Sequence, residues 1–182
     1  MALIDEVMAL HTLCTREEYG FLRECAESAP DGLFVELGTF QGASTIVIAD
    51  VANERGLPCL TIDNFSMQRT PTNPQVVRNN LSRAGIDPLP RIVSSQSHIV
   101  PNDVGKVAFL FIDTDHRAEV LNPELDAWLP LVSPGGIVAL HDYNCPERYP
   151  TMTPAIDGRL GDSDEWERIG LVGHLVAFQR RV

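Results

Sequence analysis

The 182-residue sequence has little positive charge and no long apolar run. Its 14 Lys and Arg residues are outnumbered by 25 Asp and Glu residues, which gives a net charge of -11 and an isoelectric point near 4.7. Sequence-independent binding to nucleic acid depends on Lys and Arg side chains that displace counterions, so we expect no nucleic-acid partner. No apolar segment approaches the roughly 20 residues of a membrane-spanning helix, so we expect no membrane partner.

The sequence also lacks paired cysteines and the features of a secretory signal. No Cys-x-x-Cys pair occurs among the four cysteines, Cys14, Cys25, Cys59 and Cys145. Their spacing suggests neither a zinc site nor a disulfide framework, and it favours free thiols in a reducing compartment. Asp5 and Glu6 stand where a secretory signal carries Lys or Arg, and no cleavage site follows an apolar segment. We therefore expect a cytoplasmic protein.

Length and patterning predict one α/β domain. A chain of this length buries about 70% of its unfolded surface in one compact core. From residue 33 onward, short apolar segments alternate with helical ones, which predicts a parallel sheet covered by helices on both faces. The expected strands are 33–37, 58–63, 91–94, 107–113 and 136–141, and the expected helices are 42–55, 73–84 and 117–131, with a further short helical piece after residue 94.

Two segments lie outside this alternation. Thr15-Arg-Glu-Glu18 has the form of a capping box and predicts a helix over 16–27, with a shorter helix before it. After residue 142, a Pro-rich loop and a weak helix lead to segments 166–170 and 174–181, which predict an antiparallel hairpin. We expect a single domain over 1–182. Its N-terminal helices occupy 1–30, and 31–182 form a doubly wound, mostly parallel seven-stranded sheet with an antiparallel C-terminal hairpin.

The turn after the first expected strand has the pattern of a nucleotide-cofactor site. It reads Phe34-Val-Glu-Leu-Gly-Thr-Phe-Gln-Gly-Ala-Ser44, with two glycines where a helix begins. Gly38 and Gly42 let the backbone approach a ligand, and the first amides of the helix face the same space. Asp63 ends the second strand about 25 residues after Gly38, where it can accept hydrogen bonds from ribose hydroxyls. A tight turn without a ligand is the alternative.

Two cofactor classes compete for this turn. A nicotinamide dinucleotide requires Gly-x-Gly-x-x-Gly, whose central glycine is absent here. Glu36 lies beside the position that the pyrophosphate would take, and a carboxylate there repels phosphate but suits a cation. The sulfonium and amino groups of S-adenosylmethionine are cationic, so the sequence favours that cofactor.

At this point the chain resembles the class I S-adenosylmethionine-dependent methyltransferases, which are Rossmann-like. The resemblance runs from about residue 33 to 181 and is most specific in Phe109-Leu-Phe-Ile-Asp-Thr-Asp-His116 and in the Pro-Gly-Gly strand that ends in His141-Asp142. It implies that the glycine turn holds the methionine end of the cofactor, Asp63 the ribose and Gln96 with Ser97 the adenine edge. The implied cofactor-binding residues are Glu36, Gly38, Thr39, Phe40, Gly42, Ser44, Asp63, Gln96, Ser97 and Asp113.

The residues that follow the fourth and fifth expected strands carry the candidate chemistry. Asp113 and Asp142 end strands that we expect to be adjacent, about 4.8 Å apart, so both carboxylates could reach one ion. In one interpretation Asp113, His141 and Asp142 bind a divalent cation, Mg or Mn, that lowers the pKa of a substrate hydroxyl. In a second, His116 or His141 is a general base oriented by Asp115 or Asp113. In a third, these groups only cap a helix and solvate a loop.

The sequence therefore predicts methyl transfer to a hydroxyl of a small metabolite or natural product, with Asp113, His116 and His141 as the candidate catalytic residues. A metal-dependent hydroxylase or hydrolase on the same scaffold is an alternative enzyme. A cofactor-binding subunit without catalytic activity is a third reading. The short N-terminal region offers little cover for an acceptor, so we also expect a homodimer in which a second subunit contributes substrate contacts.

Overall fold

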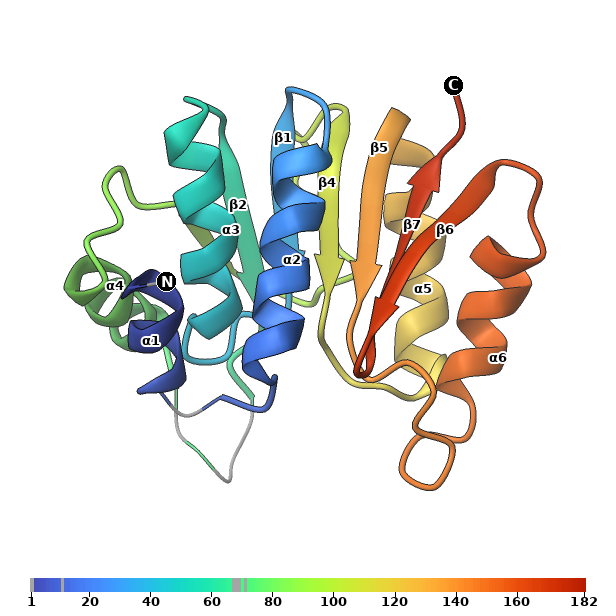
Figure 1. Cartoon of the computed structure of the whole chain (residues 1–182), viewed down its shortest axis with the longest axis horizontal. Helices are drawn as coiled ribbons and strands as arrows, with labels where there is room; N and C mark the ends of the chain where they lie inside the picture. Colours follow the sequence, from blue (N-terminus) through green and yellow to red (C-terminus); the bar gives the residue numbers. More distant parts are fainter. Residues whose placement is uncertain (1, 11, 67–69, 71) are drawn as a thin grey trace.

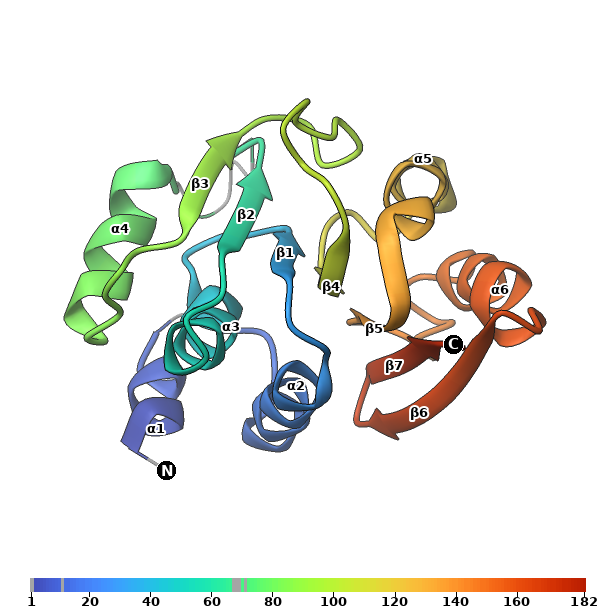
Figure 2. The ribbon, with the colours of Figure 1, turned by 90° about the horizontal axis from the view of Figure 1, so that it is seen from above.

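A computed structural model describes residues 2–10, 12–66, 70 and 72–182. It contains one seven-stranded sheet between two layers of helices (Figures 1 and 2). The strands lie in the order β3-β2-β1-β4-β5-β7-β6, parallel from β3 to β5 and antiparallel for the last two. Their bounds are β1 Leu33–Leu37, β2 Cys59–Asp63, β3 Arg91–Ser94, β4 Val107–Ile112, β5 Val132–Leu140, β6 Trp166–Val172 and β7 Leu175–Arg180. This confirms the predicted fold class.

The helices divide between the two faces of the sheet (Figure 2). One layer holds α1 Ala2–Met8, α2 Arg16–Ser28, α3 Ala43–Glu54 and α4 Pro74–Arg83. The other holds α5 Ala118–Trp128, a 3-10 turn at Leu129–Leu131, α6 Met152–Ile156 and a π-helical turn at Asp157–Gly161. Within the described residues, no helix has the length and apolar character needed to cross a membrane.

The central strands are buried on both faces, as their continuous apolar sequences predict. Side chains alternate along a strand, so successive residues enter opposite halves of the core. Phe34 and Phe109 face the layer of α2 and α3, with ring centroids 5.4 Å apart. Their neighbours Val35 and Leu110 face α5 instead. The sheet edge at the ends of β1 and β4 is therefore fixed by packing from both sides.

The capping box of α2 is present as predicted. Thr15 Oγ1 accepts from the Glu18 amide at 3.2 Å, and the Thr15 amide donates to Glu18 Oε2 at 2.7 Å. The bonds stabilise the start of a helix whose first-turn amides have no partner within the helix. They also hold the Glu18 carboxylate at the end of α2 that lies near the carboxyl edge of the sheet.

Three expectations differ from the structure by more than two residues. The short helical piece predicted after residue 94 is wrong: residues 95–106 form turns, with bonds from Ile99 to Gln96 and from Val104 to Pro101. Pro101 has no amide to donate and disfavours helical geometry in the residue before it. The helix expected to end at 131 becomes a 3-10 turn at Leu129–Leu131, next to Pro130. Strand β5 starts at Val132 rather than 136, and its pairing with β4 shifts register across this segment.

Gly38 allows the ends of β1 and β4 to meet. Its φ is +92°, and a Cβ at this position would lie 1.9 Å from the Asp113 carbonyl oxygen. The Gly38 amide donates to Ile62 O at 2.9 Å and the Asp113 amide donates to Leu37 O at 2.8 Å. Any side chain at residue 38 would push the two strand ends apart.

We predict that Gly38→Ala lowers the free energy of unfolding by more than about 2 kcal/mol, because the new Cβ meets backbone and the backbone angle is unfavourable for alanine. Gly20→Ala is the matched control, since residue 20 lies inside α2 with no atom within 4 Å of an added Cβ. That variant should gain up to about 1 kcal/mol from helix propensity. Urea unfolding followed by circular dichroism measures both, and equal effects of the two substitutions would contradict the close approach.

Candidate active site

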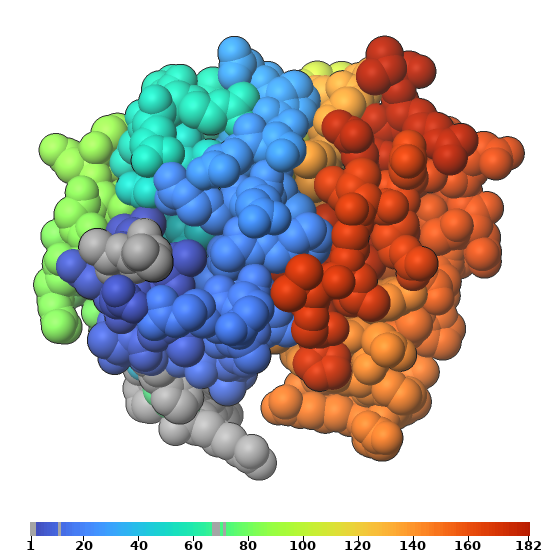
Figure 3. All heavy atoms as spheres, viewed as in Figure 1, coloured from blue at the N-terminus to red at the C-terminus, as the bar shows by residue number. Residues whose placement is uncertain are grey.

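Polar side chains gather at the carboxyl edge of the parallel strands, the lower edge of the sheet in Figure 1. Strand order reverses between β1 and β4, and ligands of such sheets sit in the crevice outside this point. In Figure 3 the surface is hollowed at this edge, between the blue N-terminal residues and the orange segment that follows β5. The candidate site is built from residues at this edge of the sheet.

Asp63 fixes the turn after β1. Its Oδ2 accepts from the Phe40 amide at 2.8 Å, and its Oδ1 accepts from the Phe65 amide at 2.6 Å. Phe40 has a φ of 49°, and its carbonyl accepts from Thr72 Oγ1 at 2.7 Å. Each Asp63 oxygen has two lone pairs, so both can accept one more hydrogen bond, as a ribose diol requires.

Glu36 is a buried anchor beneath the same turn. Its Oε1 accepts from Ser44 Oγ at 2.5 Å, and its Oε2 accepts from Thr45 Oγ1 at 2.5 Å and Thr61 Oγ1 at 2.6 Å. Burial raises the pKa of Glu36 to about 7, although the three hydroxyl donors lower it. Ser44 is likewise buried. Both residues lie under the turn, where they hold the start of α3 in place.

Thr39 and Gly42 complete the turn, and both are buried. The Thr39 side chain is buried and shares a hydrogen bond with Thr61 Oγ1. Gly42 is the N-cap of α3 with a φ of +90°, and no side chain caps the helix there. The first amides of α3 therefore have no capping side chain at the turn.

A second buried carboxylate ties together the loops after β3 and β4. Glu124 of α5 accepts from Ser97 Oγ and, at 2.8 Å, from Thr114 Oγ1. Trp128 Nε1 donates to the Ser97 carbonyl at 2.7 Å. Burial raises the pKa of Glu124, against the lowering effect of the two hydroxyls. Gln96 is exposed, and its Oε1 accepts from Asn64 Nδ2 at 3.3 Å.

The structure brings together all four predicted residues at the ends of β4 and β5. His116 Nε2 lies 2.9 Å from Asp142 Oδ2 and 3.9 Å from Asp113 Oδ1. His141 Nδ1 lies 3.5 Å from Asp113 Oδ1 and 3.7 Å from Asp142 Oδ2. Burial raises the pKa of Asp142, but His116 and His141 outweigh it and the net shift is downward. Two carboxylates and two imidazoles thus form one cluster.

The sequence suggested Asp113 or Asp115 as the carboxylate that orients His116, but the carboxylate nearest to its Nε2 is that of Asp142. Asp115 forms an exposed pair with Arg117, whose Nη2 lies 2.6 Å from Oδ2. The carboxylate that orients His116 is that of Asp142, and the ring of Tyr149 packs against the imidazole with centroids 4.3 Å apart. Asp142 has a φ of 58°, a turn that the sequence did not reveal.

The cluster fits a divalent cation by its donor chemistry. One donor atom from each of Asp113, His141 and Asp142 lies within 4.8 Å of the others. A ligand set of carboxylate oxygens suits Mg. A set that also includes an imidazole nitrogen suits Mn as well as Mg. These three residues are the predicted ligand set, and their role as metal ligands stays a prediction.

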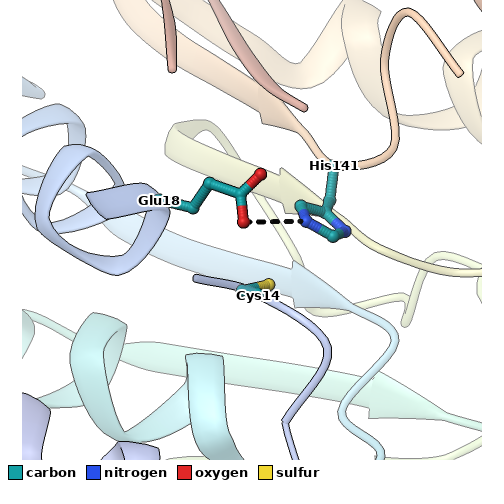
Figure 4. Close-up of side chains that lie close together, drawn as sticks. All are labelled: Cys14, Glu18 and His141. Atoms are coloured by element: carbon teal, nitrogen blue, oxygen red, sulfur yellow. Dashed lines mark ion pairs between the residues drawn. The ribbon is translucent and has the colours of Figure 1, made fainter. Parts of the chain in front are cut away.

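The N-terminal segment contributes two residues that the sequence did not single out. Cys14 and Glu18 lie beside the His141 ring (Figure 4), with Glu18 Oε2 3.6 Å from Nε2, whereas the other ring nitrogen, Nδ1, is the one near Asp113. Burial lowers the pKa of His141, but Asp113 and Cys14 raise this pKa by a larger amount, so the net shift is strongly upward. The capping box located Glu18 in a helix, but nothing local in the sequence indicated that it reaches β5.

Buried Glu36 predicts a pH dependence of stability. The folded-state pKa of about 7 exceeds the ordinary 4.5, so the folded chain holds this proton to higher pH than the unfolded chain. The contribution of Glu36 to stability therefore falls as pH rises from about 4.5 to about 7. We expect cofactor-free wild type to lose roughly 2–3 kcal/mol relative to Glu36→Gln between pH 5 and 8 in urea unfolding. Parallel profiles for the two proteins would contradict this.

Comparisons with known proteins in sequence and in structure point to methyltransferases. A family model described as a methyltransferase domain matches residues 35–143, more than half of the chain. The structure is similar to that of the O-methyltransferase NovP, at 19% identity and a TM-score of 0.77, covering 94% of this chain and 83% of that one. TomG from Streptomyces achromogenes, an O-methyltransferase in complex with S-adenosylmethionine, is 16% identical with a TM-score of 0.68, over 100% and 91% of the two chains.

CalS11, a TDP-rhamnose 3'-O-methyltransferase, gives 15% identity and a TM-score of 0.68 over 97% of this chain and 91% of that chain. Likeness at these identities shows a shared fold, and the family model adds the match in sequence. The chain belongs to the methyltransferase-domain family and has the class I S-adenosylmethionine-dependent methyltransferase fold.

Proposed function

We propose that this protein transfers the methyl group of S-adenosylmethionine to a hydroxyl of a small molecule. The observation that carries the proposal is the cluster of Asp113, His116, His141 and Asp142 directly beside the Gly38 turn. Methyl transfer from a sulfonium is an in-line displacement that needs an aligned, deprotonated oxygen. Carboxylates and imidazoles beside the cofactor turn are the groups that such a step requires.

The cofactor would lie across the carboxyl edge of β1, β2 and β4. Gly38, Thr39, Phe40 and Gly42 supply the backbone of the turn for its methionine end, above the buried pair of Glu36 and Ser44. Asp63 has lone pairs left for the ribose hydroxyls. The loop of Gln96 and Ser97 would contact the adenine edge, and Glu124 holds that loop in place.

The acceptor would enter from the hollow beside the segment that follows β5. His116, whose Nε2 lies 2.9 Å from Asp142 Oδ2, would take the proton of the attacking hydroxyl. Asp113 and His141 complete the polar wall, and the Asp113 carboxylate favours the cationic sulfonium. TomG acts in tomaymycin synthesis and CalS11 on TDP-rhamnose, which supports a small natural product or sugar-bearing metabolite as the acceptor class.

A divalent cation, Mg or Mn, would be held by Asp113, His141 and Asp142. When bound, it would supply Lewis acidity that lowers the pKa of the acceptor hydroxyl. The net charge of -11 supports a small-molecule acceptor rather than a nucleic acid. We further propose a cytoplasmic homodimer.

The proposal predicts that cofactor binding and methyl transfer can be separated. Asp113→Asn should bind S-adenosylmethionine within a few-fold of wild type by calorimetry, because most of the cofactor contacts lie on the turn and on Asp63. It should lose about 100-fold or more in the rate of labelled methyl transfer to a panel of small hydroxylated acceptors. Asp103→Asn, at an exposed carboxylate paired with Arg91, is the matched control and should leave both unchanged.

Calorimetry with NAD, and each titration repeated with Mg and Mn, completes the experiment. NAD binding without S-adenosylmethionine binding would overturn the proposal. Tight S-adenosylmethionine binding without transfer to any acceptor would instead indicate a cofactor-binding subunit. Turnover that needs metal but no methyl donor would indicate a hydroxylase or hydrolase.

A further inference from the structure

Cys14, Glu18 and His141 form a second cluster of donor atoms on the far side of the His141 ring. Figure 4 shows the three side chains converging from the segment before α2, from α2 and from the end of β5. One donor atom of each lies within 4.8 Å of the others. The residues are only 8%, 2% and 4% exposed. Methyl transfer as proposed above does not use Cys14 or Glu18.

The His141 ring has one nitrogen without a partner. Among the buried side-chain nitrogen and oxygen atoms of the described residues, Nε2 of His141 is the one that makes no hydrogen bond. Glu18 Oε2 lies 3.6 Å away, beyond hydrogen-bond distance. Leaving a buried polar atom unsatisfied is unfavourable, so a group that occupies this position would stabilise the site.

The opposite nitrogen of the ring is already placed against a carboxylate. Nδ1 lies 3.5 Å from Asp113 Oδ1. Histidines that bind metals usually donate their other ring N–H to a carboxylate or carbonyl, which directs the lone pair at the metal. His141 has this arrangement, and once the proton on Nε2 is released, the lone pair of this nitrogen is directed toward Cys14 and Glu18.

We propose that Cys14 Sγ, a Glu18 carboxylate oxygen and His141 Nε2 bind one divalent transition-metal ion, with Zn²⁺ as the preferred ion. Thiolate, imidazole and carboxylate are the donors that Zn²⁺ takes in proteins, whereas Mg takes oxygen. Glu18 Oε2 already accepts two bonds, from the Thr15 amide and the Thr15 hydroxyl, whereas Oε1 accepts one, from the His174 amide at 2.7 Å, so Oε1 has the lone pair left for the metal. Three protein ligands leave one tetrahedral position open, and binding releases the thiol proton of Cys14 and the Nε2 proton of His141.

Such an ion would clamp the N-terminal segment onto the catalytic edge. Cys14 directly precedes the capping box and Glu18 is part of it, and Glu18 also holds the turn between β6 and β7 through His174. A neutral imidazole has one lone pair, so His141 can serve this ion or the Asp113–Asp142 cation, but not both. With Zn²⁺ on Nε2, His141 would become a hydrogen-bond donor to Asp113, and the two carboxylates and His116 would be left to face the acceptor.

Cys145, a second thiol that lies beside a histidine, provides a matched control. Cys145 Sγ lies 3.1 Å from His174 Nδ1. Cys145 is more exposed than Cys14, and it is absent from the groups of three donors that the described residues form. Replacing Cys145 therefore tests whether any thiol-bound metal belongs to this pair instead.

The experiment titrates Co²⁺, a spectroscopic substitute for Zn²⁺, into reduced protein freed of metal by chelator dialysis. Wild type and Cys145→Ser should each bind one equivalent and show a thiolate-to-cobalt charge-transfer band that added Zn²⁺ removes. Cys14→Ser should lose the band and bind Zn²⁺ at least about tenfold more weakly in a chromophoric chelator competition. Circular dichroism establishes that each variant is folded.

A measurement on wild type keeps the proposal testable if Cys14→Ser does not fold. X-ray absorption of the one-equivalent Zn²⁺ complex should show one sulfur at about 2.3 Å, with nitrogen and oxygen for the other ligands. An absent cobalt band, a band lost only in Cys145→Ser, or a shell of oxygen and nitrogen alone would overturn the proposal. Calorimetry with S-adenosylmethionine reports on the cofactor site separately, so failure of one proposal is distinguishable from failure of the other.

Discussion

The approach of Gly38 to the Asp113 carbonyl is the constraint on which the site depends. It closes the point where strand order reverses, and it places the first residue after β1 and the first residue after β4 in direct contact. The turn that would hold the cofactor and the carboxylate that would face the acceptor therefore belong to one rigid unit. A methyl donor and its acceptor must meet in line, and a fixed distance between these two groups provides for that.

Buried carboxylates stabilise the loops around this contact. Glu36 joins the start of α3 to β2 through the hydroxyls of Ser44, Thr45 and Thr61, Glu124 joins the loops after β3 and β4, and Glu18 joins α2 to the β6–β7 turn. An unpaired buried carboxylate is strongly unfavourable, so each one is surrounded by donors and in turn restricts the position of those donors. The segments that follow β1, β3 and β4 are thus held in place before any ligand binds.

Much of this arrangement could be predicted from local patterns. The apolar strands, the capping box at Thr15 and the glycine turn are short-range features, and the structure confirms them. The adjacency of Asp113 and Asp142 followed from the topology of parallel strands. The roles of Cys14, Glu18 and Glu124 could not be foreseen, because their partners lie far along the chain. Glu124 stands within the apolar face of α5, and an acid at such a position is the one signal that was available.

We propose that one cofactor lies across the ends of β1, β2 and β4 with its reactive group toward Asp113. A crystal structure with S-adenosylhomocysteine, the demethylated product, tests this placement most directly. We expect the sulfur between the Gly38 turn and the Asp113–His116 cluster, the ribose hydroxyls on Asp63 and the adenine beside Gln96 and Ser97. A product molecule bound elsewhere, or one with its sulfur facing away from Asp113, would contradict it.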